Sequence, residues 1–384
     1  MRFPEFSGEW ERDSLMNIAS ISKGSGISKE QLSDSGLPCI LYGELYTKYK
    51  SEVITDIYSK TDIETKGLVS SMANDVIIPC SGEAAIEIAT ARCVPMSNIL
   101  LGGDLNIIRL NGHDGRFFAY QLNGKRKIDI AKVAQGVSVV HLYGEHLKKI
   151  NVVYPSFAEQ NKIAQLLSLI DERIVTQNKI IEKLESLIKG ICNKLLFADN
   201  GKPVRLIDIL TERTEKTKEN NQHEVLSSTV KGIFSQREYF SKDIASENNI
   251  GYKIIRLYDI VLSPQNLWMG NINYNEKFKV GIVSPSYKIF SIKAEFDKRF
   301  VAFMLKTHRA LYNYMLVSEQ GASVVRRNLN MEAFEQLVFK MPPYNKQRKI
   351  GKTLSLLQTR LELESKIKLN YEQQKKHLLT EMFI

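Results

Sequence analysis

Apolar residues recur at alternating steps of four and three through the middle of the chain. The series is Ile163, Leu167, Ile170, Ile174, Gln177, Ile181, Leu184, Ile188, Ile191 and Leu195. All but Gln177 are apolar, and this spacing is the a/d seam of a coiled coil. It predicts a central long helix within residues 155–197, in which about 38 helical residues would span roughly 57 Å.

A second, less regular seam lies near the end of the sequence. Its members are Ile350, Leu354, Leu357, Leu361, Glu364, Lys368 and Lys375. The apolar members predict a C-terminal long helix over residues 342–384, and the charged ones indicate that it packs on another protein or shifts register. Both helices follow a proline, where no amide donor is lost. Two long amphipathic helices bury their stripes most simply by packing antiparallel against each other.

The remaining sequence has the pattern of mixed α/β domains. Short β-rich runs at 74–79, 106–110, 258–262 and 287–292 alternate with helix-like stretches such as 298–316. The pattern gives no strand order. We therefore expect two globular segments, residues 1–154 and 198–341, separated by the two long antiparallel coiled-coil helices.

The chain is a tandem duplication. A shift of 187 aligns residues 155–197 with 342–384 without a gap, and 12 of the 43 positions are identical. Upstream, residues 118–120 match 301–303, and Gln-Gly-x-Ser-Val-Val occurs at both 135–140 and 320–325. Each copy is thus a globular segment followed by a long helix. Glycine in this repeated motif permits a tight or positive-φ turn.

Composition suggests a polyanionic partner. The 384 residues carry a net charge of +10, with a pI near 9.2. Counting along the chain gives −1 for residues 1–154 but +5 each for 198–341 and 342–384. No apolar run reaches membrane-spanning length, so we expect a cytoplasmic protein without a membrane partner. Cys39, Cys80, Cys93 and Cys192 lack metal-ligand spacing, which favours buried free thiols and no metal.

Two apparent catalytic motifs fail on chemical grounds. Met341-Pro-Pro-Tyr344 resembles the motif with which adenine-N6 methyltransferases hold their target amine, but a thioether is a poor acceptor for that amine. Gly351-Lys-Thr353 resembles the end of a phosphate-binding loop, but it falls inside the predicted second helix. We expect a chain without an active site or cofactor of its own.

The order of these features resembles the specificity (S) subunit of type I restriction-modification systems. Each copy ends in Gln-Gly-x-Ser-Val-Val, then a short strand, a proline and a helix beginning with Glu159-Gln-Asn-Lys-Ile163 or Lys346-Gln-Arg-Lys-Ile350. The resemblance implies that residues 1–154 and 198–341 are target-recognition domains. Each would read one half of a bipartite, asymmetric target in double-stranded DNA, and the helices would fix the spacer.

The same resemblance places catalysis on partner chains. It implies two methyltransferase (M) subunits docked on the helices, with motor-nuclease (R) subunits joining that core. S-adenosylmethionine, and ATP with Mg²⁺, would then be bound by those partners. This chain would be the non-catalytic subunit of an adenine-N6 methyltransferase and ATP-dependent restriction endonuclease complex.

Candidate DNA-contacting residues are polar, basic or aromatic and lie in predicted turns. They are Lys23, Arg92, Lys125, Arg126, Lys127, Ser138, His141, Lys231, Arg237, Gln265, Asn266, Trp268, Asn271, Ser323, Arg326, Arg327 and Asn328. Arginine and asparagine suit guanine and adenine edges or phosphates. The alternatives are a packed scaffold turn for the repeated motif, and solvated turns for Lys125 to Lys127 and for the glycine loop after Lys23.

Candidate partner-binding residues lie on the helix seams. They are Gln160, Ile163, Leu167, Ile170, Ile174, Ile181, Leu184, Gln347, Ile350, Leu354, Leu357 and Leu361. A different class of function also fits the pattern: a duplicated coiled-coil adaptor that joins proteins and does not read DNA. The nearly neutral first segment favours that alternative, and the salt dependence of DNA binding distinguishes the two.

Overall fold

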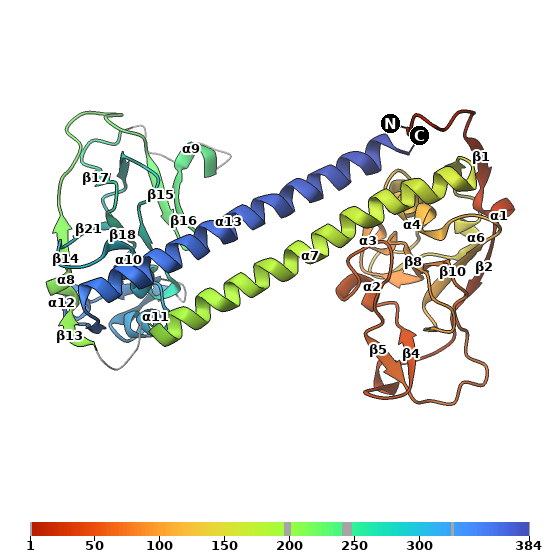
Figure 1. The fold of residues 1–384 in the computed structure, drawn as a ribbon, viewed down its shortest axis with the longest axis horizontal. Helices are drawn as coiled ribbons and strands as arrows, with labels where there is room; N and C mark the ends of the chain where they lie inside the picture. Colours follow the sequence, from red (N-terminus) through yellow and green to blue (C-terminus); the bar gives the residue numbers. More distant parts are fainter. Residues whose placement is uncertain (1, 196–200, 240–247, 324–325, 384) are drawn as a thin grey trace. The chain divides into compact units, whose positions relative to one another are not determined.

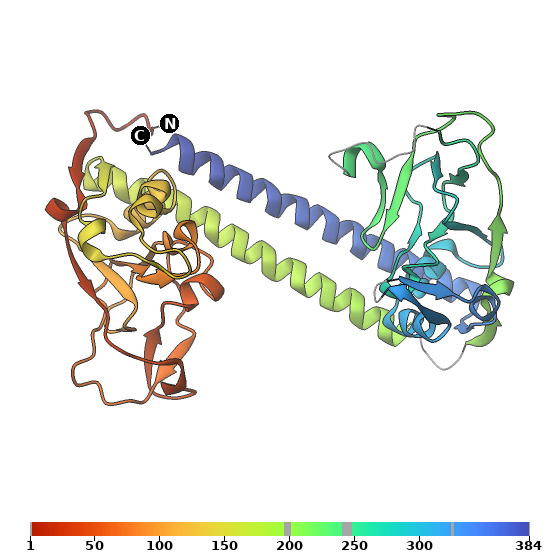
Figure 2. The same cartoon turned by 180° about the vertical axis from the view of Figure 1, so that it is seen from behind.

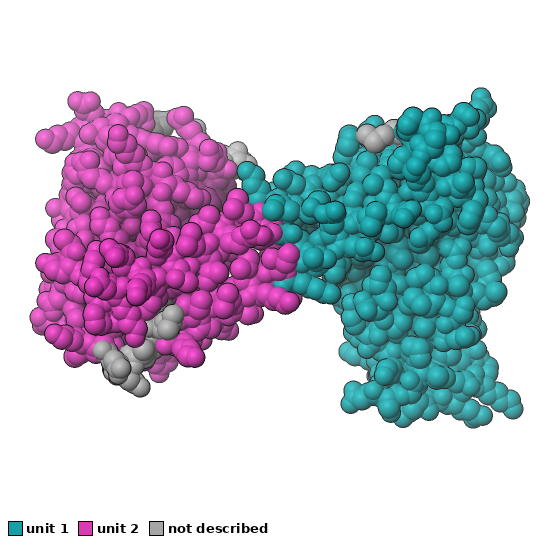
Figure 3. Space-filling view, in the orientation of Figure 1, with its two compact units in different colours: residues 1–179, 365–384 teal, residues 180–364 magenta. Residues whose placement is uncertain are grey.

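The computed structural model describes residues 2–195, 201–239, 248–323 and 326–383, with only the backbone at 195, 320–323 and 326. The chain forms two compact units (Figure 3), Met1–Lys179 with Ser365–Ile384, and Ile180–Glu364. The long helices α7 (Phe157–Leu195) and α13 (Tyr344–Glu381) each contribute to both units. The expected mixed α/β fold, duplicated and continued into long helices, is confirmed.

The first unit is built on a four-stranded antiparallel sheet. Its strands run in the order β2 (Ala19–Lys23), β10 (Leu105–Leu110), β6 (Asp75–Pro79) and β8 (Arg92–Val94). Beside it, β1 (Glu11–Ser14) pairs with β12 (Asn151–Tyr154), the strand that leads into α7. The helices of this unit are α1 (Leu15–Ile18), α2 (Glu44–Thr47), α3 (Ala85–Ile88), α4 (Gly115–Asn123), α5 (Lys127–Val133) and α6 (Gly144–Leu147).

A second small sheet of the first unit projects away from the start of α7 (Figures 1 and 2). Its order is β3 (Leu32–Ser33), β5 (Ser59–Thr61), β4 (Leu37–Ile40) and β9 (Leu100–Leu101), with η1 (Lys29–Gln31) before it. A short pair, β7 (Ser81–Gly82) with β11 (Val140–His141), joins the repeated Gln-Gly-x-Ser-Val-Val segment to the end of β6.

The second unit repeats the main sheet with the same strand order. That order is β14 (Leu210–Arg213), β21 (Lys288–Ile292), β18 (Ile260–Leu262) and β19 (Ile272–Tyr274). Beside it, β13 (Lys202–Arg205) pairs with β24 (Val338–Met341) just before α13. The helices are α8 (Leu206–Ile209), α9 (Gln236–Tyr239), η2 (Leu267–Met269), α10 (Lys298–Leu305), α11 (His308–Leu316) and α12 (Met331–Glu335). The duplication seen in the sequence is therefore also one of topology.

Three two-stranded pairs complete the described part of the second unit. They are β15 (Leu226–Thr229) with β16 (Gly232–Ser235), β17 (Lys253–Arg256) with β20 (Val280–Val283), and β22 (Ser318–Ser323) with β23 (Arg326–Leu329). The β22–β23 hairpin carries the second Gln-Gly-x-Ser-Val-Val segment, of which residues 324–325 lie outside the described residues.

Each long helix begins with the same anchor to the globular part before it. The side-chain amide of Gln160 donates to the carbonyl of Pro155 (2.8 Å) and accepts from the amide of Asp114 (3.1 Å). In the second copy Gln347 donates to Pro342 (2.8 Å) and accepts from Asp297 (3.0 Å). Both amides are buried, so their bonds are shielded from water and fix the angle at which each helix leaves its domain.

The two helices run antiparallel where they meet in the first unit. Asp171 of α7 contacts Lys375 of α13, and the Arg173 guanidinium lies 3.5 Å from the Tyr371 hydroxyl. Beyond these contacts Leu378, Met382 and Phe383 are buried in the first unit's core. The charged seam of α13 was expected to reflect either a contact with another protein or a shift of register. The first alternative is wrong at Lys375, because its partners are carboxylates of this chain.

Candidate nucleic-acid interface

In the second unit the structure joins two segments that are about 60 residues apart in sequence. The backbone amide of Arg327, on β23, donates to the carbonyl of Gln265 (3.2 Å). The Arg327 guanidinium lies 4.9 Å from the centre of the Trp268 ring on η2. Asn266 precedes η2 and Asn328 is exposed on the same hairpin as Arg327. These five residues form what we call the Arg327 surface.

The Arg327 surface has the chemistry needed to read base edges. Packing on the indole and a 3.5 Å hydrogen bond from Nη1 to the Met315 carbonyl hold the planar guanidinium in one orientation. A guanidinium held in this way can present paired N–H donors to a planar acceptor pair. Such a fork fits the O6 and N7 acceptors of guanine, and the neighbouring amide side chains fit adenine. The side chains of Ser323 and Arg326 lie outside the described part of the structure, although their backbones pair across the hairpin.

A second exposed element of this unit is the β15–β16 hairpin. Lys231 is exposed at its turn, and Arg237 is exposed on α9, where Phe234 and Tyr239 stack with ring centres 4.7 Å apart. Asn271 is different, and its assignment as a DNA contact is corrected. It is only 4% exposed. Its side-chain amide accepts from the Ser228 hydroxyl (2.9 Å) and donates to the Ser228 carbonyl (3.0 Å), so it stabilises the β15–β16 hairpin from inside the fold.

The first unit places Lys23 and His141 together through a shared aromatic ring. The Lys23 ammonium lies 6.0 Å from the centre of the Tyr143 ring, and the imidazole of His141 stacks on the same ring at 6.2 Å. The backbone of His141 exchanges hydrogen bonds of 2.9 and 2.7 Å with Gln135, closing the repeated motif into a loop that exposes Ser138. We call Lys23, Ser138, His141 and Tyr143 the His141 surface.

Glycine is required where this loop closes. Gly136 has a φ of +123°, and a Cβ there would lie 2.1 Å from the carbonyl oxygen of Val139. Both facts exclude a side chain at this position without local rearrangement. The prediction of a positive-φ turn in the motif is confirmed for the first copy.

The predicted Lys125 to Lys127 cluster does not join the His141 surface. Lys125 is exposed and lines a groove of about 740 Å³ in the first unit, together with Lys50, Lys368 and Lys376. Arg126 lies 3.5 Å from Asp129, and burial lowers the pKa of Lys127. Lys125 thus lies beside residues of the long helices, Arg126 pairs within α5, and Lys127 is half-buried.

The assignment of Arg92 as a DNA contact is also corrected. It is 8% exposed on β8, and its guanidinium donates to the carbonyls of Ala91 and Tyr49, both at 3.1 Å. Burial also lowers its pKa. A guanidinium committed to backbone carbonyls inside the fold cannot reach DNA, so Arg92 stabilises the first unit.

Seven of the twelve predicted partner-binding residues are also reassigned. Gln160, Ile163, Leu167, Ile170, Gln347, Ile350 and Leu354 are at most 5% exposed within this chain. They attach each helix to its own globular domain and offer no surface to another protein. Ile174, Ile181, Leu184, Leu357 and Leu361 are partly exposed, so their role as partner contacts stays a prediction.

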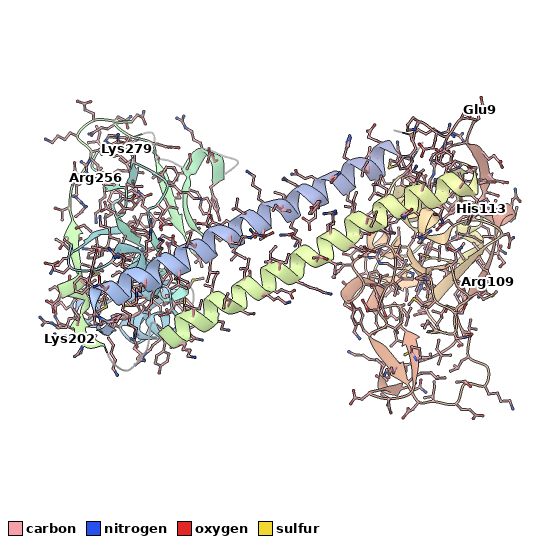
Figure 4. All side chains as sticks on the ribbon, in the orientation of Figure 1. Glu9, Arg109, His113, Lys202, Arg256 and Lys279 are labelled. Carbon is pink, nitrogen blue, oxygen red and sulfur yellow. The ribbon has the colours of Figure 1, made fainter. Side chains whose placement is uncertain are left out.

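The sequence reasoning missed the residues that receive the helix anchors. Asp114 caps α4 by accepting from the amide of Arg116 (2.9 Å), and Asp297 caps α10 by accepting from Phe300 (2.9 Å). In the first copy His113, labelled in Figure 4, adds a 3.1 Å contact to Gln160, and burial lowers its pKa. The available signal was positional, because the shift that pairs residues 118–120 with 301–303 also pairs Asp114 with Asp297.

These observations define a class of protein. Two copies of one α/β domain each expose a polar and aromatic loop surface, and each continues into a long helix. Among the described residues no helix is long and apolar enough to cross a membrane. In the same part of the chain no group of His, Cys, Asp and Glu side chains could hold a metal ion. The chain is thus organised as a duplicated recognition protein.

The chain belongs to the family described as the type I restriction modification DNA specificity domain, whose model matches residues 7–186 and 202–373. A putative type I restriction enzyme MjaX specificity subunit from Methanocaldococcus jannaschii is 23% identical over 98% of this chain and 93% of that protein. The present chain is therefore a DNA specificity subunit with two target-recognition domains, and the purely adaptor function is not favoured.

Solved structures share the fold. The type I restriction-modification S subunit from M. genitalium matches with a TM-score of 0.66 at 16% identity, over 100% of this chain and 99% of that one. A chain from a study of complex assembly and conformational transition of a type I R-M system matches with a TM-score of 0.50 at 11% identity, over 98% and 97%.

Proposed function

We propose that the two target-recognition domains read two different short elements of one bipartite DNA target. The observation that carries this proposal is the contrast between equivalent surfaces on a repeated fold. The His141 surface offers imidazole, lysine and tyrosine, whereas the Arg327 surface offers guanidinium, amides and indole. Different donors and acceptors on the two copies select different bases, so the target is asymmetric.

The long helices act as the spacer element in this proposal. A 39-residue helix such as α7 is roughly 58 Å long and is stiff compared with a loop. Base pairs between the two half-sites would go unread while their number is set by the helices. Adenine-N6 methylation with S-adenosylmethionine, and cleavage driven by ATP with Mg²⁺, would then belong to M and R subunits.

Salt dependence of DNA binding tests the recognition function. With M subunits present, binding to the specific target is expected to weaken about 1,000-fold or more between roughly 50 and 200 mM salt, because phosphate contacts release counterions. The measurement is a fluorescence anisotropy titration with a target duplex and a scrambled duplex of equal length. A flat salt response on both duplexes would contradict DNA recognition and favour the adaptor.

Two M subunits would dock on recurring exposed apolar residues of the helices. Phe157 and its repeat equivalent Tyr344 are 55% and 47% exposed, and Leu169 and its equivalent Leu356 are 49% and 62% exposed. Large apolar side chains kept on both copies and turned to solvent indicate a surface that another protein covers. One such set in each copy supports a stoichiometry of two M subunits per chain.

Charge placed on this surface is expected to remove one M subunit at a time. Leu169→Glu and Leu356→Glu should each weaken one docking site by about 30-fold or more, because a carboxylate would be buried in an apolar contact. Native mass spectrometry should show one M subunit with either single variant and none with both. Lys179→Glu and Lys366→Glu, another recurring and exposed pair, are the matched controls. Full occupancy in the Leu169→Glu, Leu356→Glu chain would exclude this surface.

A further inference from the structure

The end of the C-terminal helix is held in the first unit by a buried ion cluster. The Lys375 ammonium lies 2.5 Å from the Asp171 carboxylate and also pairs with the Glu52 carboxylate. The Tyr120 hydroxyl donates to the other oxygen of Asp171 (2.8 Å). The three charged side chains are between 8% and 14% exposed, so water does little to stabilise their charges.

The four members come from four different parts of the first unit. Glu52 lies in the loop after α2, Tyr120 on α4, Asp171 on α7 and Lys375 on α13. Lys375 is thus the cluster member contributed by α13, and it pairs with two carboxylates contributed by other parts of the unit. Past it, Leu378, Met382 and Phe383 complete the core of this unit.

At the equivalent positions of the second unit, all of them among the described residues, no such ion cluster forms. The repeat alignment puts Phe303 where Tyr120 stands, Gln358 where Asp171 stands and Ile188 where Lys375 stands. Ile188 and Phe303 pack against the apolar core of the second unit. The two copies therefore receive the end of a long helix with different chemistry, one ionic and one apolar.

Other charged groups near the cluster do not replace Lys375. Arg92 and Lys127 are close enough to interact with Glu52 electrostatically. The Arg92 guanidinium is nevertheless committed to the carbonyls of Ala91 and Tyr49. Burial raises the pKa of Asp171, and Lys375 opposes that rise. Without the ammonium, two carboxylates would remain in a mostly dry site without a direct cation.

We propose that the Glu52, Asp171 and Lys375 cluster selects which helix end docks on the first recognition domain. It accepts the C-terminal helix and rejects the equivalent end of a central helix, such as that of a second copy, which would insert Ile188. An isoleucine there would leave both carboxylates buried and unpaired. Removing one partner of a buried ion pair destabilises a protein far more than replacing the whole pair with apolar residues does. The inference rests on the repeated fold and is independent of what the loops bind.

The test places the central helix's residue in the C-terminal helix of the full chain. Lys375→Ile should speed hydrogen exchange of the amides from Leu378 to Met382 by about 100-fold or more. Adding Glu52→Gln and Asp171→Asn removes the stranded charges, so the triple variant should return to within about tenfold of the original chain. Lys376→Ile, an exposed lysine shared by both repeats, is the matched control and should change nothing.

Each outcome decides the proposal. Unchanged exchange in Lys375→Ile would show that the site tolerates the apolar helix end, and selection would be refuted. Failure of the triple variant to recover, or to fold, would show that the loss does not come from unpaired carboxylates, which also refutes it. Failure of Lys375→Ile alone to fold, together with a folded triple variant, supports selection.

Discussion

Adding one heptad to both long helices is expected to lengthen the unread spacer of the DNA target by about three base pairs. Seven residues add about 10.5 Å to a helix, and base pairs rise by roughly 3.4 Å. The insertions belong after Lys179 and after Glu364, where the chain passes between its two units, so that contacts inside each unit are kept. Methylome sequencing of cells expressing the chain with its partners should show both half-sites unchanged.

The matched control is the same heptad in α7 alone. This single insertion shifts the apolar seam of α7 relative to that of α13. Methylation should therefore be lost, and no target with a longer spacer should be methylated. The added base pairs also turn the second half-site by roughly 100° about the DNA axis. Affinity is therefore expected to fall with the double insertion, and spacer length is the decisive readout. An unchanged spacer in the doubly extended chain would contradict a helical ruler.

The two long helices were predictable from sequence because their signal is local. The seam from Ile163 to Leu195 needs only the spacing of apolar residues, and the structure has α7 over Phe157–Leu195. Strand order was not predictable, since β10 pairs with both β2 and β6 through contacts that no short window contains. Register and pairing of distant strands depend on the whole core.

Predicted residue roles were wrong where a polar or charged side chain was assigned to DNA without knowledge of its burial. Arg92 and Asn271 were chosen for their side-chain chemistry, but both belong to inner hydrogen-bond networks. The a/d pattern likewise identifies the buried face of a helix, whereas the docking surface that we propose consists of exposed residues such as Leu169 and Leu356. Lys375 looked like a defect in the seam because its partner Glu52 lies 323 residues away in sequence.

In the Arg327 surface the structure joins two segments that the sequence analysis had singled out separately. Gln265, Asn266 and Trp268 were chosen as a polar and aromatic loop, and Arg327 and Asn328 as the polar end of the repeated motif. The structure brings these two segments into contact. Sequence alone could not show that contact, because the segments join through the packing of η2 beside a hairpin that is distant in the chain.

Replacing Arg327 with alanine is expected to relax reading of one half-site only. Loss of a stacked guanidinium contact to a base should reduce discrimination at that position by about 10- to 100-fold, or about 1–3 kcal/mol. Arg327→Lys should not restore it, because an ammonium lacks the planar fork that stacks on Trp268. The measurement is competition at constant salt, with M subunits present, between duplexes altered in one half-site or the other.

Arg205→Ala is the matched control for that experiment. Arg205 is about half exposed in the same unit and pairs with Asp208 (2.9 Å), away from the η2 loop and the β22–β23 hairpin in sequence. A phosphate contact by Arg327 would weaken binding to every duplex equally and lower the salt slope by about one. A uniform loss in Arg327→Ala would therefore reject base reading at this residue, whereas loss confined to one half-site assigns that half to the second domain.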